Sequence, residues 1–291
     1  PIRDLVGQRP RVLAVDERQK VVAAEAEVVW SVGCRPVFEV STASGRVLRA
    51  TAEHRVLSGE GWRTVGELGP GARIALARCL PVESASSSWQ DHELILLGHL
   101  VGDGSYVKHQ PLRYTTASEE NSSAVRTAAE AMGSVVTRHA GRGNWHQLVI
   151  SGNGNRWHPR GVGGWLKSLG IFGQRSHEKR LPAPVFALPD EQVALLLRHL
   201  WATDGSIHVR NHGRGGDRVH FATCSEQLAR DVAALLLRLG IVGRIRAVAQ
   251  RSARLLYSVD VSGAEQQRIF LARVGAFGPR APQAAALAAR L

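Results

Sequence analysis

Hydrophobic and polar residues follow two different patterns along the chain, one before and one after a serine-rich stretch. Before it, short apolar runs at residues 11–15, 37–40 and 46–50 alternate with glycine-rich segments at 58–61 and 69–71. Short runs bounded by Gly, Pro and Ser are typical of β-strands joined by turns. Several such strands at close spacing predict a compact, twisted all-β module over residues 1–82.

After residues 83–90, which we interpret as a linker because of their serine content, apolar residues recur at helical spacing. This second part of the chain also repeats itself. Residues 96–105 return as 197–206, and three further segments return in the same order: 116–119 as 223–226, 148–152 as 259–263, and 165–173 as 270–278. Four matches in register predict two similar α+β halves, 91–190 and 191–291, related by a pseudo-two-fold axis.

Each repeat opens with a predicted helix that ends in Asp-Gly, at Asp103-Gly104 and at Asp204-Gly205. Glycine suits a left-handed helix stop. A carboxylate at the negative end of the helix dipole is locally unfavourable, and a residue that departs from its local preference in this way indicates a functional role. Small residues at Gly98 and Gly102 predict a close crossing of the two helices, which would bring both carboxylates to one end of the seam. The alternative, two unrelated solvated helix ends, is disfavoured by the duplication.

The candidate site is rich in oxygen, because Asp103 and Asp204 would lie beside the backbone carbonyls of Gly102 and Thr203. Such a site suits Mg²⁺, which beside a DNA phosphate activates water and stabilises the leaving oxygen. The charge of the chain agrees with a nucleic-acid partner: Lys and Arg number 37 against 25 Asp and Glu, and all but four of these cations are arginines. Arginine forks pair bidentately with phosphates and with guanine edges. A basic excess without a polybasic tail favours nucleic acid over a membrane surface.

Membrane and secretion signals are missing from the sequence. No apolar run reaches the length of about 18 residues that a transmembrane helix needs, and no apolar leader opens the chain. Three scattered cysteines predict neither a disulfide framework nor a zinc knuckle. We therefore expect a cytoplasmic protein with no membrane partner.

Residues 96–104 (LLGHLVGDG) and 197–205 (LRHLWATDG) resemble the two motifs of the LAGLIDADG homing endonucleases, and residues 178–182 (EKRLP) are similar to a block that precedes the second motif in intein endonucleases. The resemblance implies a duplicated αββαββα domain whose saddle-shaped sheets lie on the major groove of double-stranded DNA. It also implies that Asp103 and Asp204 share divalent metal ions and cut both strands. His199 and Thr203 are bulkier than the family pattern and are expected to loosen the seam, so a catalytically decayed DNA-binding module is the alternative.

Candidate DNA contacts come from basic residues near the predicted site. Lys108 follows the first acid closely in sequence, and Arg210, Arg214 and Arg218 follow the second. Each of these side chains also has an ordinary interpretation, as a solvated or phosphate-facing residue on the surface.

Thr51-Ala52-Glu53-His54 follows the predicted strand 46–50 and precedes Gly61-Trp62 and residues 65–68. This order resembles a block of the Hint (hedgehog/intein) fold, the self-splicing domain of inteins. The resemblance implies that His54 polarises or protonates the scissile peptide and that Thr51 helps to position it. A histidine suits this role because its pKa lies near neutrality. Taken alone, His54 would be interpreted as a core histidine beside a strand.

The order of the parts resembles an intein that carries a homing endonuclease, of the type found in bacterial replicative DNA helicases (the DnaB family). This implies two partners: the intein insertion site in DNA, and a flanking host protein, the extein, in cis. The chain runs from Pro1 to Leu291. By comparison with the family pattern, the first block and the C-terminal part of the Hint domain are missing, so splicing is not expected from this chain. A hedgehog-type autoprocessing domain without nuclease function is a further alternative, which the doubled Asp-Gly helices disfavour.

Overall fold

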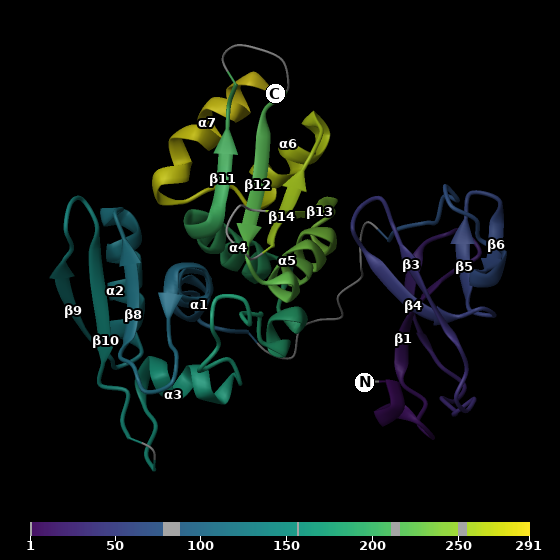
Figure 1. Ribbon diagram of the computed structural model, residues 1–291, viewed down its shortest axis with the longest axis horizontal. Helices are drawn as coiled ribbons and strands as arrows, with labels where there is room; N and C mark the ends of the chain where they lie inside the picture. The colour runs from purple at the N-terminus through teal and green to yellow at the C-terminus, as the bar shows by residue number, and fades with distance from the viewer. Residues whose placement is uncertain (1, 78–87, 156, 211–215, 250–254) are drawn as a thin grey trace. The chain divides into compact units, whose positions relative to one another are not determined.

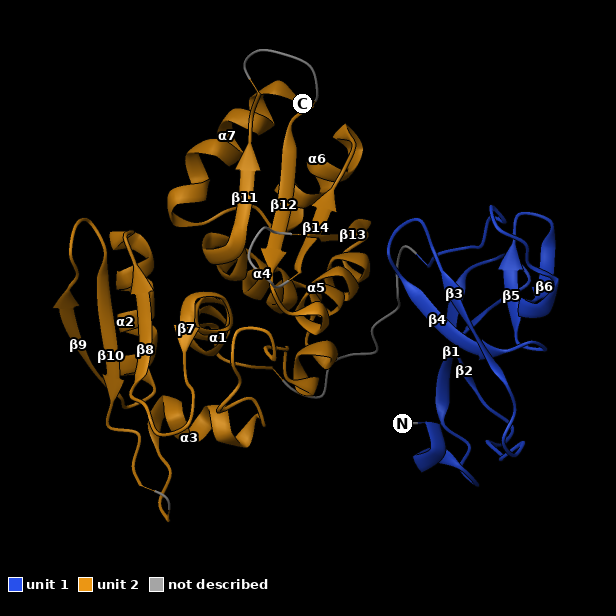
Figure 2. Cartoon of the chain, viewed as in Figure 1, with its two compact units in different colours: residues 1–83 blue, residues 84–291 orange. Residues whose placement is uncertain are grey.

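The computed structural model describes residues 2–77, 88–155, 157–210, 216–249 and 255–291. They form two compact units, Pro1–Glu83 and Ser84–Leu291, which Figure 2 shows in different colours. Most of the predicted linker, residues 83–90, lies outside the described residues. Among the described residues, no helix combines the length and the hydropathy that a bilayer crossing requires.

The first unit consists of three antiparallel hairpins with short 3₁₀ helices beside them, and the strands predicted at 11–15, 37–40 and 46–50 are confirmed. Its core is shallow, because among its described residues Ala50 and Val65 alone are less than a tenth exposed. The elements are η1(Ile2–Leu5), β1(Arg11–Val15), β2(Val21–Glu25), β3(Val37–Ser41), β4(Val47–Thr51), β5(Arg55–Ser58), β6(Gly61–Thr64) and η2(Val65–Glu67).

The second unit contains two consecutive segments with the same order of elements, helix-strand-strand-helix-strand-strand-helix. The first segment comprises α1(Asp91–Asp103), β7(Gly104–Ser105), β8(Leu112–Thr116), α2(Glu119–Ala131), β9(Val135–Ala140), β10(His146–Ser151) and α3(Gly161–Ser168). Its strands form an antiparallel sheet in the order β7-β8-β10-β9. Helix α2 packs on one face of this sheet and leaves the other face open (Figure 1).

After η3(Ala183–Ala187), the second segment repeats this arrangement, and its sheet has the equivalent order β11-β12-β14-β13. Helix α5 covers the inner face of this sheet. The elements are α4(Asp190–Asp204), β11(Gly205–His208), β12(Arg218–Thr223), α5(Glu226–Arg238), β13(Gly243–Val248), β14(Leu256–Val261) and α6(Ala264–Arg273), followed by η4(Gly278–Arg280) and α7(Ala281–Arg290).

Helices α1 and α4 pack against each other and join the two segments through a seam of fully buried leucines, among them Leu97 and Leu200. A Cβ atom on Gly98 would lie 2.8 Å from the backbone N of Leu200, and one on Gly102 would collide with Thr203 Oγ1. Glycine at these positions is what allows the close crossing. The expectation that His199 and Thr203 loosen the seam is wrong, because each lies opposite a glycine that makes room for it.

The prediction of a left-handed stop at the two Asp-Gly pairs is also wrong. Gly104 and Gly205 have extended backbones, with φ of −76° and −82°, and lead directly into β7 and β11. Glycine is needed there for space instead: a Cβ on Gly104 would collide with the carbonyl of Leu100, and one on Gly205 with the Trp201 ring. Each helix therefore turns into a strand immediately after its carboxylate.

The close crossing at Gly98 gives a stability prediction with a definite sign. Alanine normally stabilises a helix interior by about 1 kcal/mol relative to glycine. At Gly98 the added methyl would press on the α4 backbone, and overpacking of this kind costs about 1–3 kcal/mol. We therefore expect Gly98→Ala to lower the free energy of unfolding in urea. Gly216→Ala is the control, because a Cβ there meets nothing within 4 Å, and a surface substitution of this kind should change stability by no more than about 0.5 kcal/mol. A stabilised Gly98→Ala variant would contradict the close crossing.

Candidate active site

Asp103 and Asp204 are the last residues of α1 and α4, and the seam brings both carboxylates to the same end. Asp103 is exposed and Asp204 is half-buried, so a ligand has access to both. The protein packed around Asp204 and the negative charge of Asp103 together raise the pKa of Asp204 to about 7. Desolvation also raises the pKa of Asp103, against the opposing charges of Lys179 and Arg280. Two carboxylates in this situation favour binding of a cation or a proton.

Lys179 is one of the two cations at this pair, and the sequence did not identify it as a site residue. It is 6% exposed, and its Nζ donates hydrogen bonds to the carbonyls of Gly102 (2.5 Å) and Gly104 (2.9 Å). The ring of Tyr106 lies 5.5 Å from the same atom. Burial lowers the pKa of Lys179 to about 8, although both carboxylates act in the opposite direction. Its signal in the sequence is its position in the 178–182 block.

Arg280 is the second cation and occupies the equivalent place in the other half. Its Nε donates to the carbonyl of Gly205 at 2.8 Å, and its Nη2 donates to that of Thr203 at 3.3 Å. Each half therefore places one cation on the terminal carbonyls of its first helix, where the negative end of the helix dipole favours positive charge. Arg280 follows the last repeated segment, 270–278, and no motif marks it.

The carbonyls of Gly102 and Thr203, which were predicted as metal ligands beside the two acids, accept hydrogen bonds from Lys179 and Arg280. Metal binding by Asp103, Asp204 and these two carbonyls stays a prediction. Among the described residues, no group of three or more His, Cys, Asp and Glu side chains converges on one point. A pair of carboxylates fits Mg²⁺, which keeps several waters and binds through one or two carboxylates together with substrate phosphates.

An open hollow of about 610 Å³ lies beside Asp103. It is lined by Asp103, Thr203 and Arg280 and by residues 116–121, which connect β8 to α2. Asn121 Nδ2 donates to the carbonyl of Ala202 at 3.2 Å and so links the wall of the hollow to α4. Both halves thus contribute to one accessible space.

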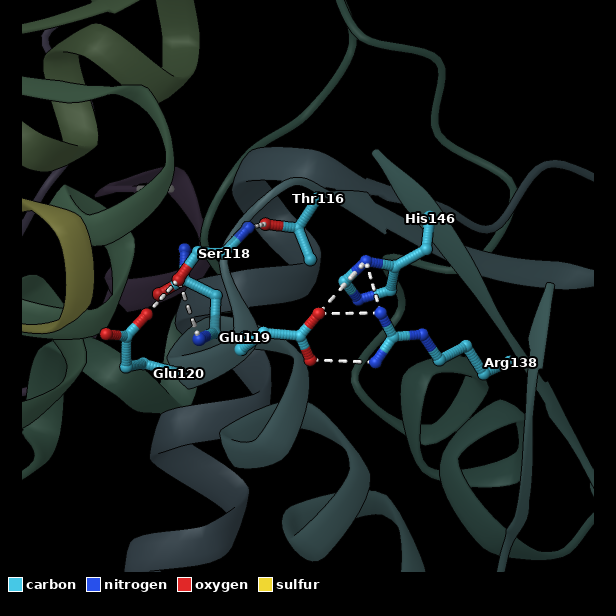
Figure 3. A network of polar contacts seen from close by, with 7 residues as sticks. Thr116, Ser118, Glu119, Glu120, Arg138 and His146 are labelled. Carbon is cyan, nitrogen blue, oxygen red and sulfur yellow. Dashed lines mark hydrogen bonds and ion pairs between the residues drawn. The ribbon is translucent and has the colours of Figure 1, made fainter. Parts of the chain in front are cut away.

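Figure 3 shows how the wall formed by the start of α2 is held in place. Arg138 donates to both carboxylate oxygens of Glu119, at 2.6 and 2.7 Å, and its Nη2 lies 3.2 Å from His146 Nδ1. Ser118 donates its backbone N–H to Thr116 Oγ1 at 3.1 Å. Strands β8, β9 and β10 therefore all anchor the first turn of α2, next to the hollow.

A buried chain of hydrogen bonds crosses the seam below the acids. The Tyr114 hydroxyl lies 3.0 Å from His99 Nδ1, and His99 Nε2 lies 3.1 Å from His199 Nδ1. Phe277 packs on His199 with ring centroids 4.4 Å apart. Burial lowers the pKa of His99 to about 3 and that of His199 to about 4, so both imidazoles are neutral near pH 7. His199, which departs from the family pattern, thus connects α4 to α1.

These neutral histidines predict a loss of stability in mild acid. Below about pH 6.5 an unfolded chain protonates both imidazoles, whereas the folded protein does not do so until near pH 3–4. Because the unfolded state binds more protons in this window, the free energy of unfolding falls as the pH is lowered through it. We expect the stability of the wild type relative to His99→Gln to fall by up to about 1.4 kcal/mol per pH unit between about pH 6 and pH 4. Urea unfolding at several pH values measures this, and exposed His139→Gln serves as the control; a flat difference for His99→Gln would contradict the prediction.

The predicted DNA contacts lie in several places. Lys108 is exposed in the loop after β7, beside Gly173, and lines a pocket with Lys167. Arg218 lies on β12 and donates to Asp260 Oδ1 at 3.0 Å. Arg210 donates its backbone N–H to Asp217 Oδ1 at 2.8 Å. Arg214 lies outside the described residues. The cations at the acid pair are therefore Lys179 and Arg280, and DNA binding by the four predicted residues stays a prediction.

Thr51 and His54 belong to the first unit. They share a turn after β4, in which the His54 backbone N–H donates to the Thr51 carbonyl at 3.2 Å. The His54 side chain is exposed, which contradicts the alternative of a core histidine. The turn is closed by Val65, whose N–H donates to the His54 carbonyl at 2.8 Å.

Comparison with known proteins matches residues 191–275 to the family model of the LAGLIDADG-like domain. The replicative DNA helicase DnaB of Rhodothermus marinus is 41% identical over 298 aligned positions, which cover 99% of this chain and 31% of the helicase. Protein RecA of Mycobacterium tuberculosis (strain ATCC 25618 / H37Rv) is 29% identical and is matched over 96% of this chain and 37% of its own length. The chain thus spans about a third of the curated relatives that it matches. Among solved structures, the homing endonuclease I-DmoI in complex with DNA and Ca has a TM-score of 0.46 at 16% identity, covering 68% of this chain and 96% of that one.

Proposed function

We propose that residues 84–291 form a metal-dependent endonuclease of the LAGLIDADG homing type that cuts both strands of DNA. The observation that carries this proposal is the acid pair: Asp103 and Asp204 share one end of the seam, and Lys179 and Arg280 are symmetrically placed beside them. Two acids with two cations are a charge arrangement suited to a phosphodiester, whose negative charge grows during hydrolysis. The match of residues 191–275 to the LAGLIDADG-like domain supports the same interpretation.

In this proposal each group has a defined task. The carboxylates of Asp103 and Asp204 would hold a divalent cation, Mg²⁺, with the carbonyls of Gly102 and Thr203 beside them. When bound, such an ion supplies an activated water and charge stabilisation for the leaving oxygen. Lys179 and Arg280 are anchored on backbone carbonyls and would direct positive charge toward the scissile phosphate. The helix seam keeps the two acids together, so that each serves one DNA strand.

We propose further that residues 1–83 are part of a Hint self-splicing domain and that the whole chain is an intein segment of a replicative DNA helicase precursor. The chain is similar, over nearly its whole length, to a third of DnaB and to a third of RecA. A segment shared by two differently named proteins is what a mobile insert would produce. The sequence also lacks the phosphate-loop pattern G-x-x-x-x-G-K-S/T. Thr51 and His54 would then act on the extein junction in cis, within the cytoplasm.

The test uses the 291-residue chain and a plasmid that carries the uninterrupted helicase-gene insertion site. With Mg²⁺ we expect one double-strand cut at that site, and with excess chelator no cut. Binding to the same duplex is measured at several salt concentrations, because phosphate contacts make affinity fall steeply with salt. Tight, salt-sensitive binding without cutting would favour the decayed DNA-binding module. If the chain neither binds nor cuts this DNA, the endonuclease proposal is overturned and the hedgehog-type alternative is left.

A further inference from the structure

The open face of the second sheet carries one shielded acid among several arginines. Asp260 lies on β14, which the strand order places between β12 and β13, and its side chain is 10% exposed. Arg218 Nη2 donates to Asp260 Oδ1 at 3.0 Å, and Arg246 Nε lies 3.8 Å from Oδ2. The side chains of the two arginines are 54% and 52% exposed. One carboxylate therefore holds two guanidinium groups whose other edges face solvent.

The register explains why these groups gather on this face. Residues directly opposite Asp260 are His220 on β12 and Arg244 on β13. Since side chains alternate between faces along a strand, the neighbouring residues Phe221 and Val259 point inward, and both are fully buried. The outward face thus carries three arginines and two histidines, His208 and His220, with a single acid, and its charge is positive.

The first sheet has the same topology and different chemistry. Thr116 opposes His146 in the first sheet as Thr223 opposes Tyr257 in the second, which fixes the equivalence of the two registers. By this equivalence Val149 takes the place of Asp260, Thr137 that of Arg244, and His139 that of Arg246. Arg113 on β8 lies opposite Val149 and takes the place of His220, and Gln147 Nε2 donates to Thr115 Oγ1 at 3.1 Å. This face thus carries one arginine and no acid on its described strands. The arginine cluster therefore belongs to one half alone among the described residues.

Both sheets extend away from the acid pair, because their first strands, β7 and β11, begin immediately after Asp103 and Asp204. A duplex cut at that pair would have one half of its target over each sheet. An exposed arginine held by a carboxylate loses little conformational freedom on binding, and its fork matches the N7 and O6 acceptors of guanine. The Gln, Thr and Val side chains of the first sheet instead suit adenine edges and thymine methyl groups.

We propose that Asp260 is a positioning residue for sequence specificity, which orients Arg218 and Arg246 to read guanines in one half of the DNA target. The other half is read by the first sheet, where no carboxylate holds a pair of arginines, and lacks this guanine requirement. The target is therefore chemically asymmetric although the fold is repeated. This inference rests on the proposed function, since it presupposes a duplex bound across both sheets.

The experiment selects bound duplexes from a library with a randomised central segment, using the 291-residue chain at moderate salt. Wild type, Asp260→Asn, the double variant Arg218→Lys with Arg246→Lys, and Gln147→Ala are compared. The lysine variants keep the charge and the carboxylate but lose the planar fork. We expect wild type to enrich guanines in one half of the recovered sequence. In Asp260→Asn and in the lysine variant, this guanine preference should fall about ten- to a hundredfold, while the other half stays unchanged.

The Gln147→Ala variant is the matched control from the first sheet, and it should alter the other half of the recovered sequence and leave the guanines intact. Guanine preference that persists in folded Asp260→Asn and in the lysine variant would overturn the inference while leaving the proposed function in place. If Asp260→Asn does not fold, the lysine variant alone decides between these results. A wild type that enriches no sequence would overturn both the inference and sequence-specific DNA recognition by this chain.

Discussion

Replacing Asp103 and Asp204 together by Asn is expected to abolish DNA cleavage and to leave DNA binding intact. Asn keeps the size of each side chain and removes the charge that would hold the metal. Metal catalysis contributes several kcal/mol to such reactions, and each 1.4 kcal/mol is a factor of ten in rate. We therefore expect the cleavage rate to fall at least about a thousandfold in the plasmid assay. Affinity for the duplex, measured by gel shift, should stay equal or increase, because two negative charges near the phosphates are lost.

The same change is expected to make the fold more stable above neutral pH, with Asp204→Asn as the clearest single variant. The pKa of Asp204 is raised to about 7 in the folded protein, against about 3.9 in an unfolded chain. Between these values the folded state binds more protons, so the stability of the wild type falls as the pH rises through the window. Asn removes this penalty. We expect Asp204→Asn to exceed wild type at pH 8 by about 1–2 kcal/mol, allowing for the partial exposure of the side chain, and to equal it near pH 4.

Urea unfolding of wild type and Asp204→Asn at matched pH isolates the contribution of Asp204 to the free energy of unfolding. The contribution of the buried histidines is the same in both proteins and cancels when the two free energies are subtracted. Asp91→Asn, at the opposite end of α1 and exposed, is the control and should cut DNA at the wild-type rate. Retained cleavage in the double variant would contradict the assignment of the acids. An Asp204→Asn variant less stable than wild type at pH 8 would contradict the environment described for the pair.

Replacing Lys179 by Met is expected to lower the cleavage rate about a hundred- to a thousandfold, as removal of one fixed electrostatic group does in other hydrolases. Met has a similar length and no charge, so the carbonyls of Gly102 and Gly104 lose their donor and the acid pair loses a neighbouring cation. Cleavage with Mg²⁺ under single-turnover conditions measures the effect on the chemical step. Circular dichroism establishes that the variant is folded.

Two further variants separate charge from geometry. Lys179→Arg retains the charge but presents a planar fork where Nζ now contacts several carbonyls, so it should recover only part of the rate. Lys108→Met removes an exposed lysine of the same half and should leave the rate of the chemical step within about twofold, because surface contacts of this kind act on binding. If Lys108→Met lost activity and Lys179→Met kept it, the active-site assignment would have to be reversed.

Residues 1–83 are predictable from the sequence strand by strand. Local apolar runs were sufficient to predict their strands, because a strand needs only a short stretch of suitable residues between turns. They do not determine how hairpins pack into a domain. The hairpins leave Trp30 and Phe38 more than half exposed, so the assignment of a Hint domain continues to rest on the Thr51–His54 resemblance.

By itself, the sequence determined that two helices each end in a carboxylate followed by glycine. That information is local: helical spacing, the Asp-Gly dipeptides and the repeat are all readable within short windows. It also predicted the close crossing, because glycines at Gly98 and Gly102 have few other reasons to interrupt a helix. The conformation of Gly104 was not readable in this way, since what excludes a side chain there is the carbonyl of Leu100 rather than a left-handed backbone.

Only the tertiary structure decided which cations act on the acids. Lys108 is five residues beyond Asp103 in the sequence, but an extended chain advances about 3.3 Å per residue and carries it away from the helix end. Lys179 and Arg280 are 77 residues beyond the carbonyls of Gly102 and Thr203 to which they donate. Their positions depend on how α3, α6 and the following turns return to the seam. Proximity in sequence points to Lys108 rather than to these two cations, because the surroundings of the acids are assembled by packing between distant segments.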